Sequence, residues 1–281
     1  MDPALLSRLL EFSNALVALG AAGLYTVFPP RKPSGHPFIS PPRWTMLHVV
    51  LFFFGLDLAY KAASPLLSVK GSPSDEFTAW MGFQSVGPLW LALFLFAIRP
   101  PIPAIELLSC SSGGLLSALR WLCGVLLVMA IAGTIAPSET VTRAFRMDAH
   151  TAGWMYFLTL LVAAGCAGLI EEVGYRGLLY GVLRTRMDPL MAMVLMSACF
   201  MLAHGGVNPL AFGMGLITAR LVENYHSVMP GIILHIGWDL AAGTNAWFLG
   251  AMNVDPHSYF EVAVIVLAGA LLAIRMIRKT S

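Results

Sequence analysis

The sequence predicts an all-α protein, a polytopic transmembrane helical bundle of about eight to nine helices. Of its 281 residues, 58% are hydrophobic and only 11% are charged, whereas a soluble globular chain carries about 25% charged residues. The apolar runs are continuous and lack the polar alternation of barrel strands, which favours membrane-spanning helices. The composition therefore predicts a multi-pass integral membrane protein surrounded by a lipid bilayer.

The charge balance and the cysteines exclude further classes. The formal net charge is +2, and no basic run is interleaved with aromatic residues, so nucleic acid is not an expected partner. The cysteines form no C-x-x-C pair, and neither a disulfide framework nor a structural zinc cluster is expected. They are Cys110, Cys123, Cys166 and Cys199.

The first region, residues 1–140, is predicted to contain amino-terminal transmembrane helices to which the sequence assigns no role. Proline-rich, basic stretches such as Pro29–Arg43 and Arg99–Pro101 separate its apolar runs, because proline does not continue a helix. The predicted helices cover residues 5–28, 44–67, 77–98 and 115–136.

The second region, residues 150–250, has apolar segments joined by short connections. Several segments fall below the ~20 residues that cross the hydrocarbon of a bilayer, which predicts helices that end inside the protein around a cavity. The predicted helices cover residues 154–183, 189–204, 209–224 and 228–250.

The third region, residues 251–281, is predicted to hold a final transmembrane helix at 259–275 and a basic tail. Lysine and arginine are concentrated in the loops on the side to which this tail belongs, and the positive-inside rule places that side in the cytoplasm. The short loops are typical of a protein of the bacterial inner (cell) membrane.

Three charged residues, Glu171, Glu172 and Arg176, end the long apolar run that begins near Trp154. Charged side chains at membrane depth cost about 2.5–3.5 kcal/mol each on insertion scales, so they usually face a protein interior or a wet cavity and mark function. On a helix, Glu172 and Arg176 share one face and can form an ion pair, while Glu171 points about 100° away. A simple ion pair at a helix end would explain Glu172 and Arg176, but not the second glutamate.

Two further polar insertions follow. His204 ends an apolar segment four residues after Phe200, where a structural helix-end histidine is the alternative to function. His235 and Asp239 lie four residues apart in the middle of an apolar segment, where the alternative is a structural hydrogen bond between them.

Three predicted helices thus supply carboxylates and imidazoles of compatible chemistry. Hydrolysis of a peptide bond needs a base for water, a means of fixing that water, and donors for the oxyanion. Glu171, His204 and the pair His235 with Asp239 can supply these groups. No G-x-S-x-G elbow is present and the cysteines lie outside the motifs, so a serine or cysteine nucleophile is not predicted.

The motifs E-E-x-x-x-R, F-x-x-x-H and H-x-x-x-(N/D) occur in this order within residues 171–239. They resemble the signature of the CPBP family, which comprises type II CAAX prenyl endopeptidases and bacteriocin-processing or self-immunity proteases and is also called the Abi family. The resemblance covers roughly residues 150–250. It implies a CAAX-protease-like catalytic core, an intramembrane endopeptidase of the glutamate type, whose substrate is a membrane-associated peptide or protein.

The resemblance also implies a role for each residue. Glu171 would be the general base that activates water, and His204 would help to hold that water. His235 would stabilise the oxyanion together with position 239. Glu172 and Arg176 would maintain the shape of the site through their ion pair.

Position 239 departs from the prenyl endopeptidases, which typically have asparagine there. Asp239 can donate a hydrogen bond to an oxyanion only when it is protonated. Three interpretations stay open: burial keeps Asp239 protonated, Asp239 accepts from His235 and orients it, or Asp239 binds a metal ion. Two histidines plus carboxylates would suit zinc. The H-E-x-x-H helix of many zinc proteases is absent, so zinc stays a candidate cofactor and an obligatory metal is not predicted.

Two other functions fit the same sequence. A non-catalytic membrane binding or immunity protein of the same family would keep the helices and bind a partner without cleaving it. A transporter or ion pathway would use Glu171, Glu172 and Asp239 to relay protons or cations, but no internal repeat of the transporter kind is present. The ionisable groups in all three motifs favour the protease.

Overall fold

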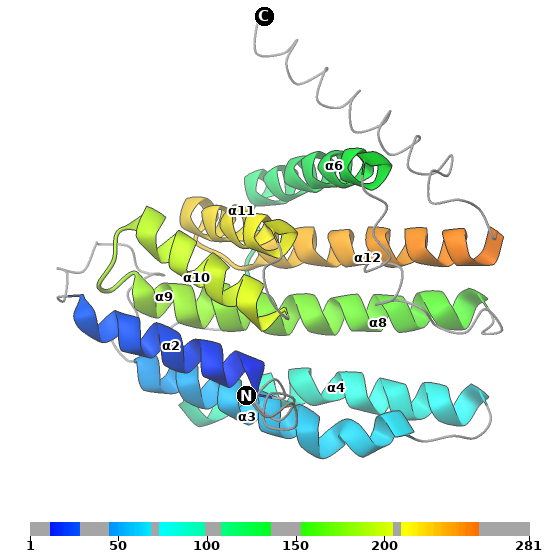
Figure 1. Cartoon of the computed structure of the whole chain (residues 1–281), viewed down its shortest axis with the longest axis horizontal. Coiled ribbons are helices and arrows are strands. Elements are labelled where there is room, and N and C mark those ends of the chain that lie inside the picture. The colour runs from blue at the N-terminus through cyan, green and yellow to red at the C-terminus, as the bar shows by residue number, and fades with distance from the viewer. Residues whose placement is uncertain are drawn as a thin grey trace, which may run out of the picture.

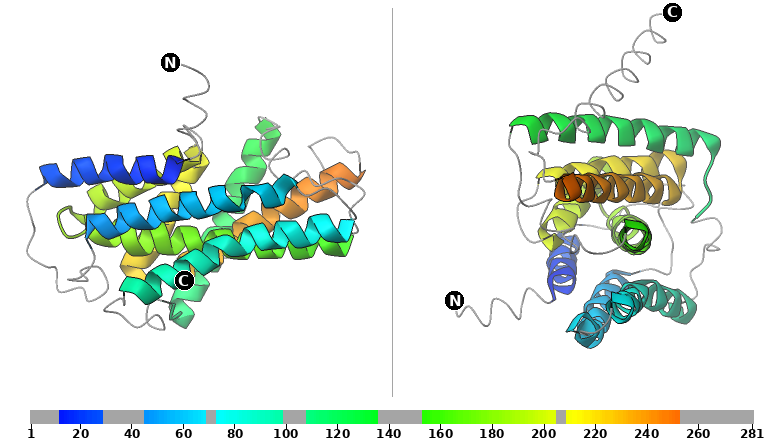
Figure 2. Two further views of the ribbon diagram at one scale, coloured as in Figure 1. Left: turned by 90° about the horizontal axis from the view of Figure 1, so that it is seen from below. Right: turned by 90° about the vertical axis from the view of Figure 1, so that its right-hand side faces the viewer.

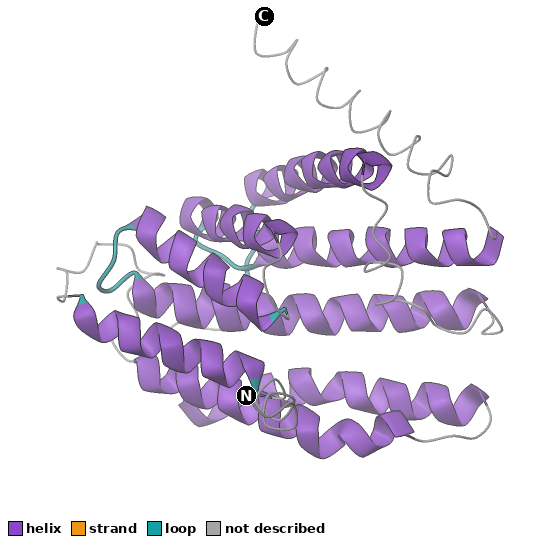
Figure 3. Cartoon of the chain, viewed as in Figure 1, coloured by secondary structure: helices purple, strands orange, loops and turns teal. Residues whose placement is uncertain are grey.

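The computed structural model describes residues 12–28, 45–68, 73–98, 108–135, 153–204 and 209–252. All regular structure in these ranges is helical, and they contain no strand (Figure 3). The all-α prediction is confirmed. The long helices are α2 (Ser13–Val27), α3 (Met46–Ala63), α4 (Pro73–Ile98), α6 (Ser112–Ile135), α8 (Gly153–Glu171), α10 (Pro189–Ala203), α11 (Pro209–Tyr225) and α12 (Met229–Met252).

Two of these helices continue into other kinds of helix. Helix α8 runs on through a π-helical segment, η2 (Glu172–Leu179), and a last α-helical turn, α9 (Tyr180–Leu183). The 3-10 turn η1 (Ser64–Ser68) follows α3. The predicted segment 154–183 therefore corresponds to one continuous helical rod. The predicted helix at 259–275 and the basic tail lie outside the described residues.

Among the described residues, three helical segments are long and apolar enough to cross a membrane, namely Met46–Leu66, Thr78–Ile98 and Tyr156–Leu183. Large apolar side chains on these segments lie on the outside, as with Phe96 and Leu93 of α4, which are 79% and 63% exposed. Such side chains suit lipid, because lipid tails are as apolar as leucine. These spans indicate a multi-pass integral membrane protein, as the composition predicts.

The helices are arranged around the rod formed by α8, η2 and α9. Helix α6 lies on one outer side next to α11 and α12, while α2, α3 and α4 lie on the other side of α8 (Figures 1 and 2). Helix α12 packs against α8, α6 and α11, and α10 packs against α11 and α2. The rod therefore has neighbours from both halves of the chain.

The core is centred on η2, whose residues Glu172–Leu179 are all buried. The Phe53 and Tyr175 rings pack with their centroids 4.6 Å apart. A β-carbon on Gly174 would lie 2.7 Å from the Phe52 ring, so glycine is what permits α3 to approach η2 this closely. Aromatic packing from α3 thus fixes the π-helical segment in place.

Helix α2 is held at both ends by charged side chains of other elements. At its start, Asp57 of α3 accepts hydrogen bonds from Asn14 Nδ2 at 2.7 Å and from Ala15 N at 2.9 Å, which satisfies a free N–H group of the first turn. At its other end, Arg186 donates to two backbone carbonyl oxygens. Tyr175 of η2 donates from its hydroxyl to Asn14 Oδ1 at 2.7 Å. Helix α2 is thereby tied to the segment that carries the charged motif.

Candidate active site

The charged motif lies where α8 changes from α-helix to π-helix, because Glu171 ends α8 and Glu172 begins η2. A π-helical turn widens the helix, and such turns occur frequently at functional sites. The sequence predicts a helix here but gives no sign of the π turn. The two glutamates on either side of this change differ in burial: the Glu172 side chain is fully buried, whereas that of Glu171 is 28% exposed.

Glu172 and Arg176 form the ion pair that their spacing predicts. Arg176 Nη1 lies 3.1 Å from Glu172 Oε1, and both side chains are completely buried. The guanidinium also lies 4.0 Å from the centre of the Phe200 ring, a geometry in which the face of the ring attracts the positive charge. The pair therefore ties η2 to α10 in the centre of the protein.

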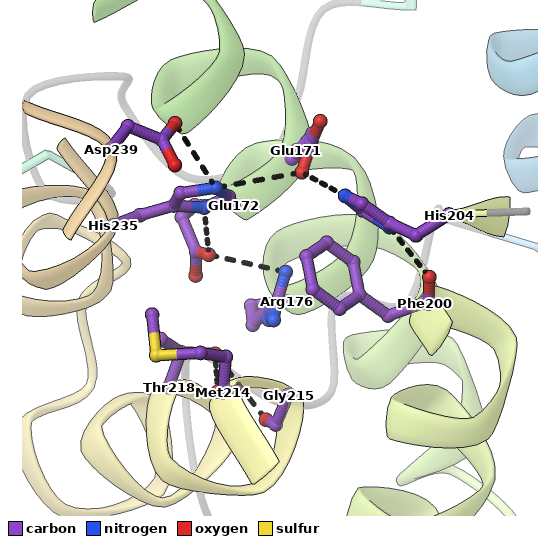
Figure 4. Close-up of polar contacts among 10 residues, drawn as sticks. All are labelled: Glu171, Glu172, Arg176, Phe200, His204, Met214, Gly215, Thr218, His235 and Asp239. Atoms are coloured by element: carbon purple, nitrogen blue, oxygen red, sulfur yellow. Dashed lines mark hydrogen bonds and ion pairs between the residues drawn. The ribbon is translucent and has the colours of Figure 1, made fainter. Parts of the chain in front are cut away.

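His235 of α12 is oriented by Glu172. His235 Nδ1 lies 2.9 Å from Glu172 Oε1, and because a carboxylate only accepts, the Nδ1–H donates. This fixes the orientation of the ring and turns Nε2 to the opposite side, towards Glu171 and Asp239 (Figure 4). Glu172 thus has two partners from two elements, His235 on α12 and Arg176 within η2.

His204, directly after α10, is oriented in a similar way by the backbone. Its Nδ1–H donates to the carbonyl oxygen of Phe200 at 2.8 Å, so Nε2 is the nitrogen that faces the site. The Phe200 ring packs against the imidazole with the ring centres 4.3 Å apart. Both histidines therefore present Nε2, each with its Nδ1 already engaged.

The imidazoles of both histidines face the carboxylate of Glu171. Its Oε2 lies 3.5 Å from His204 Nε2 and 3.6 Å from His235 Nε2, and it makes no hydrogen bond to the described residues. This oxygen is buried, while the side chain as a whole is partly exposed, so the other carboxylate oxygen is the accessible one. Glu171 thus faces two imidazoles with one oxygen and open space with the other.

Asp239 approaches the same nitrogen of His235 from α12. Its Oδ2 lies 3.7 Å from His235 Nε2, and the side chain is 21% exposed. The cluster contains three carboxylates but only one guanidinium, so it has excess negative charge unless both imidazoles are protonated. Nearby carboxylates favour the charged form of an imidazole.

All six residues named from the sequence lie in one cluster (Figure 4). They come from α8, η2, the end of α10, and α12, which places the three motifs side by side as the order of the helices predicts. Two members of the cluster were not assigned from the sequence. Phe200 appears there only as a letter of a motif, yet its ring contacts Arg176 and His204, and Gly231 gives no sequence signal at all.

Gly231 allows α12 to approach Glu172. A β-carbon at this position would lie 2.6 Å from Glu172 Oε2, closer than carbon and oxygen atoms that are not bonded come. Arg176 and His235 both contact the other carboxylate oxygen, Oε1, so a shift of the carboxylate away from a β-carbon would disturb both contacts. Only glycine leaves this geometry intact.

Replacement of Gly231 by alanine is therefore expected to displace the Glu172 carboxylate and to tilt His235. A misplacement of about 1 Å in a catalytic group can reduce a rate about 100-fold, so for the peptide hydrolysis that the sequence predicts we expect a loss of about 10- to 100-fold in turnover. Gly165→Ala in α8 is the matched control, since nothing lies within 4 Å of a β-carbon there. Equal turnover by the two variants would contradict the role given to Gly231.

A zinc ion would require its donors to surround one point at about 2.0–2.2 Å. In the part of the chain that the structure describes, no group of three or more histidine, cysteine, aspartate or glutamate side chains has this geometry. The facing atoms of Glu171 and the two histidines lie 3.5 and 3.6 Å apart. No zinc site is therefore assigned among the described residues, and no step below is assigned to a metal ion.

The region that contains this cluster matches a known protein family. Residues 153–241 match the model of the Rce1-like family, described as type II CAAX prenyl endopeptidase Rce1-like. No protein of curated function and no solved structure matches the chain. The matched residues include all three motifs and leave out α2, α3, α4 and α6.

Proposed function

Because residues 153–241 carry an Rce1-like domain, we propose that the protein is an intramembrane endopeptidase of the glutamate type. It cleaves a peptide bond in a membrane-associated protein or peptide. The observation that carries this proposal is the convergence of three helical elements on Glu171, whose Oε2 faces Nε2 of both His204 and His235. An ion pair that only stabilised the end of a helix would need neither histidine.

Glu171 acts as the general base. Its carboxylate takes a proton from a water molecule, and the water oxygen attacks the carbonyl carbon of the scissile peptide bond. His204 has its Nδ1–H engaged by the Phe200 carbonyl, so its Nε2 faces the site and can hold that water by a hydrogen bond. When the tetrahedral intermediate breaks down, the C–N bond cleaves and the proton held by Glu171 passes to the leaving amine nitrogen.

His235 stabilises the negative charge that develops on the carbonyl oxygen. The buried Glu172 accepts from Nδ1, which favours an imidazolium whose Nε2–H can donate to the oxyanion. In serine hydrolases, a buried carboxylate likewise orients a histidine ring and stabilises its imidazolium form. Arg176 neutralises Glu172 and holds it in position.

Asp239 assists His235. At 3.7 Å from Nε2, Oδ2 is too far for a direct hydrogen bond but close enough for its charge to favour the imidazolium. This distance does not support the second of the three interpretations, in which Asp239 accepts a hydrogen bond from His235; the role proposed for Asp239 is electrostatic. Asparagine would keep the shape of the side chain and could donate to the oxyanion.

The Asp239→Asn variant is therefore expected to retain cleavage within about tenfold of the wild type. Asp239→Ala leaves neither a charge nor a donor, and loss of one donor to an oxyanion costs about 10²- to 10³-fold. Initial rates at equal amounts of folded protein measure both effects. If Asp239→Asn were as inactive as Asp239→Ala, the negative charge itself would be the essential property.

The site of action is a membrane, and we place it in the bacterial inner membrane. The support is the three segments of the described residues that are long and apolar enough to span a membrane, together with the short loops of the sequence. The proposed substrate approaches through the bilayer or from its surface, because the cluster lies within helices that face lipid.

A cleavage assay in liposomes tests the function. The purified protein is reconstituted and incubated with a library of tagged, membrane-anchored peptides, with and without a chelator, and new termini are identified by mass spectrometry. The expected result is cleavage at a defined bond in a subset of peptides, and the chelator reports on a need for metal. Stable capture of peptides without any new terminus would instead support the non-catalytic binding protein.

A further inference from the structure

The side chains of Asp57, Asn14 and Tyr175 form a chain of hydrogen bonds that joins three helical elements. Asn14 lies at the start of α2, Asp57 on α3 and Tyr175 on η2. Asn14 Nδ2 donates to Asp57 Oδ1 at 2.7 Å, and the Tyr175 hydroxyl donates to Asn14 Oδ1 at 2.7 Å. Both α2 and α3 lie outside the matched range 153–241. The chain of bonds therefore links the amino-terminal helices to the segment that carries Glu172 and Arg176.

The Asp57 carboxylate fixes the direction of the bonds in this chain. A carboxylate only accepts hydrogen bonds, so the Asn14 amide turns its NH₂ group to Asp57 and its oxygen to Tyr175. Asp57 is buried, and its second oxygen accepts from Ala15 N at 2.9 Å. A rotation of the carboxylate would therefore cost a bond to the first turn of α2. The Asn14 oxygen is thus held as a fixed acceptor for the Tyr175 hydroxyl.

The Tyr175 ring is held on two further sides by aromatic rings. Phe53 of α3 packs against it with the ring centres 4.6 Å apart. Phe200 of α10 lies 5.2 Å from it, with the ring planes at 80°, which is the edge-to-face arrangement that aromatic pairs favour. Because Phe53 and the hydroxyl hydrogen bond fix the Tyr175 ring, that ring in turn restricts where the Phe200 ring can lie.

Phe200 connects Tyr175 to the cluster of charged residues. Its ring contacts the Arg176 guanidinium at 4.0 Å and the His204 imidazole at 4.3 Å (Figure 4). The His235 ring lies 6.1 Å from the same phenyl ring. Protein interiors are close-packed and transmit displacements from one side chain to the next. A shift of the Phe200 ring would therefore displace the His204 imidazole.

The same network borders a space into which Tyr175 could move. Asn14, Tyr175 and Glu171 all line a cavity of about 310 Å³, which α3 and α4 enclose together with α8. Since the interior is otherwise close-packed, a cavity is where a released side chain has room to change its position. The hydrogen bond to Asn14 therefore has a task that packing alone does not perform, which is to keep the Tyr175 ring against Phe200.

We propose that Tyr175, anchored by Asn14 and Asp57, is a positioning residue that holds the Phe200 ring and, through it, the His204 imidazole in the reacting geometry. The inference rests on the proposed function, in which His204 holds the attacking water. Tyr175 touches neither the water nor the substrate and acts through Phe200. Helix α2 then contributes to the reaction, because it supplies the anchor.

The first test observes His204 directly, so that it does not depend on cleavage. Tyr175→Phe removes the hydroxyl and keeps the ring. The protein is prepared with isotopically labelled histidine, and the His204 resonance is identified by its loss in His204→Gln. The aromatic ring packed against His204 alters the magnetic field there, so a change in their arrangement moves this resonance. We expect Tyr175→Phe to shift the His204 resonance in detergent micelles, although neither Phe200 nor His204 has been altered.

Cleavage kinetics provide the second readout. A misplacement of about 1 Å in a catalytic group can cost about 100-fold, and for the smaller shift allowed by Tyr175→Phe we expect kcat to fall about three- to tenfold. KM should stay unchanged, because His204 acts on the water. Asn14→Leu removes the same anchor, so the double variant should lose no more than either single variant. A role in stability alone would lower the unfolding midpoint and leave kcat per folded molecule unchanged.

Tyr25→Phe is the matched control. It also removes a hydroxyl contact of α2, since the Tyr25 hydroxyl lies 2.9 Å from Thr185 Oγ1. Tyr25 lies about 16 Å further along α2 than Asn14, at about 1.5 Å per residue. The control therefore loosens the opposite end of the same helix, and it should change neither the His204 resonance nor kcat.

The outcomes separate this inference from the protease assignment. A shifted His204 resonance together with a lower kcat in Tyr175→Phe supports the positioning role. An unshifted resonance, an unchanged kcat in a protein that cleaves peptides, or an equal response to Tyr25→Phe overturns it. If the wild type cleaves no peptide while Tyr175→Phe alone shifts the resonance, the anchoring of His204 stands and the protease assignment fails.

Discussion

Replacement of Glu171 by glutamine is expected to lower the rate of peptide cleavage by about 10²- to 10⁴-fold, the range that general base catalysis contributes. Glutamine keeps the length and shape of the side chain but cannot take a proton from water. The amide can still face His204 and His235, so the protein should fold as before. Single-turnover cleavage in liposomes, together with the thermal unfolding midpoint in detergent, measures the two effects separately.

Asp188→Asn provides the control for this variant. The Asp188→Asn variant also removes a carboxylate, but one that caps α10 by accepting a hydrogen bond from Met191 N at 2.9 Å. Asparagine caps a helix equally well. Its cleavage rate should therefore equal that of the wild type. Wild-type cleavage by the Glu171→Gln variant would exclude Glu171 as the base.

Glu172→Leu is expected to have the largest effect on stability. It leaves the Arg176 guanidinium completely buried without its anionic partner, and removal of one member of a buried ion pair costs about 3–5 kcal/mol. None of the Arg176 side-chain nitrogens makes a hydrogen bond to the described residues, so after the substitution the guanidinium keeps only its contact with the face of the Phe200 ring. Denaturant titration in detergent measures the change in the free energy of unfolding.

The opposite variant, Arg176→Met, should cost less. Glu172 would still accept from His235 Nδ1, which leaves its charge partly satisfied. The double variant Glu172→Leu/Arg176→Met contains no buried charge and should regain most of the lost stability, since apolar replacements of buried ion pairs are often neutral. It should stay inactive, because His235 has lost the group that orients it. Equal losses in the two single variants would contradict this account of the pair.

The positions of the helices could be predicted well from the sequence. The segment predicted at 209–224 is α11 at Pro209–Tyr225, and the one at 189–204 is α10 at Pro189–Ala203. Long apolar runs and flanking prolines are local signals, so they are visible without a structure. The division of the chain near residue 150 into a helical region without an assigned role and a catalytic core stays a prediction.

The polar residues of the cluster could also be predicted, because the spacing within each motif is local. Glu172 and Arg176, or His235 and Asp239, lie four residues apart, and a helix brings such residues to one face. The spacing does not indicate that Glu172 bonds to His235, which lies 63 residues further along the chain. That contact requires α12 to pass close to η2. Gly231 permits this close approach, but the sequence does not indicate that Gly231 faces Glu172.

By itself, the sequence determined the membrane environment, the helical class and the identity of the six polar residues, because composition and four-residue spacing carry this information. Only the tertiary structure decided which imidazole nitrogen faces which carboxylate, that Phe200 packs against both Arg176 and His204, and that α3 and α4 enclose a cavity beside Glu171. These features depend on contacts between residues far apart in the chain. Packing of whole helices determines such contacts, and no local pattern of residues specifies them.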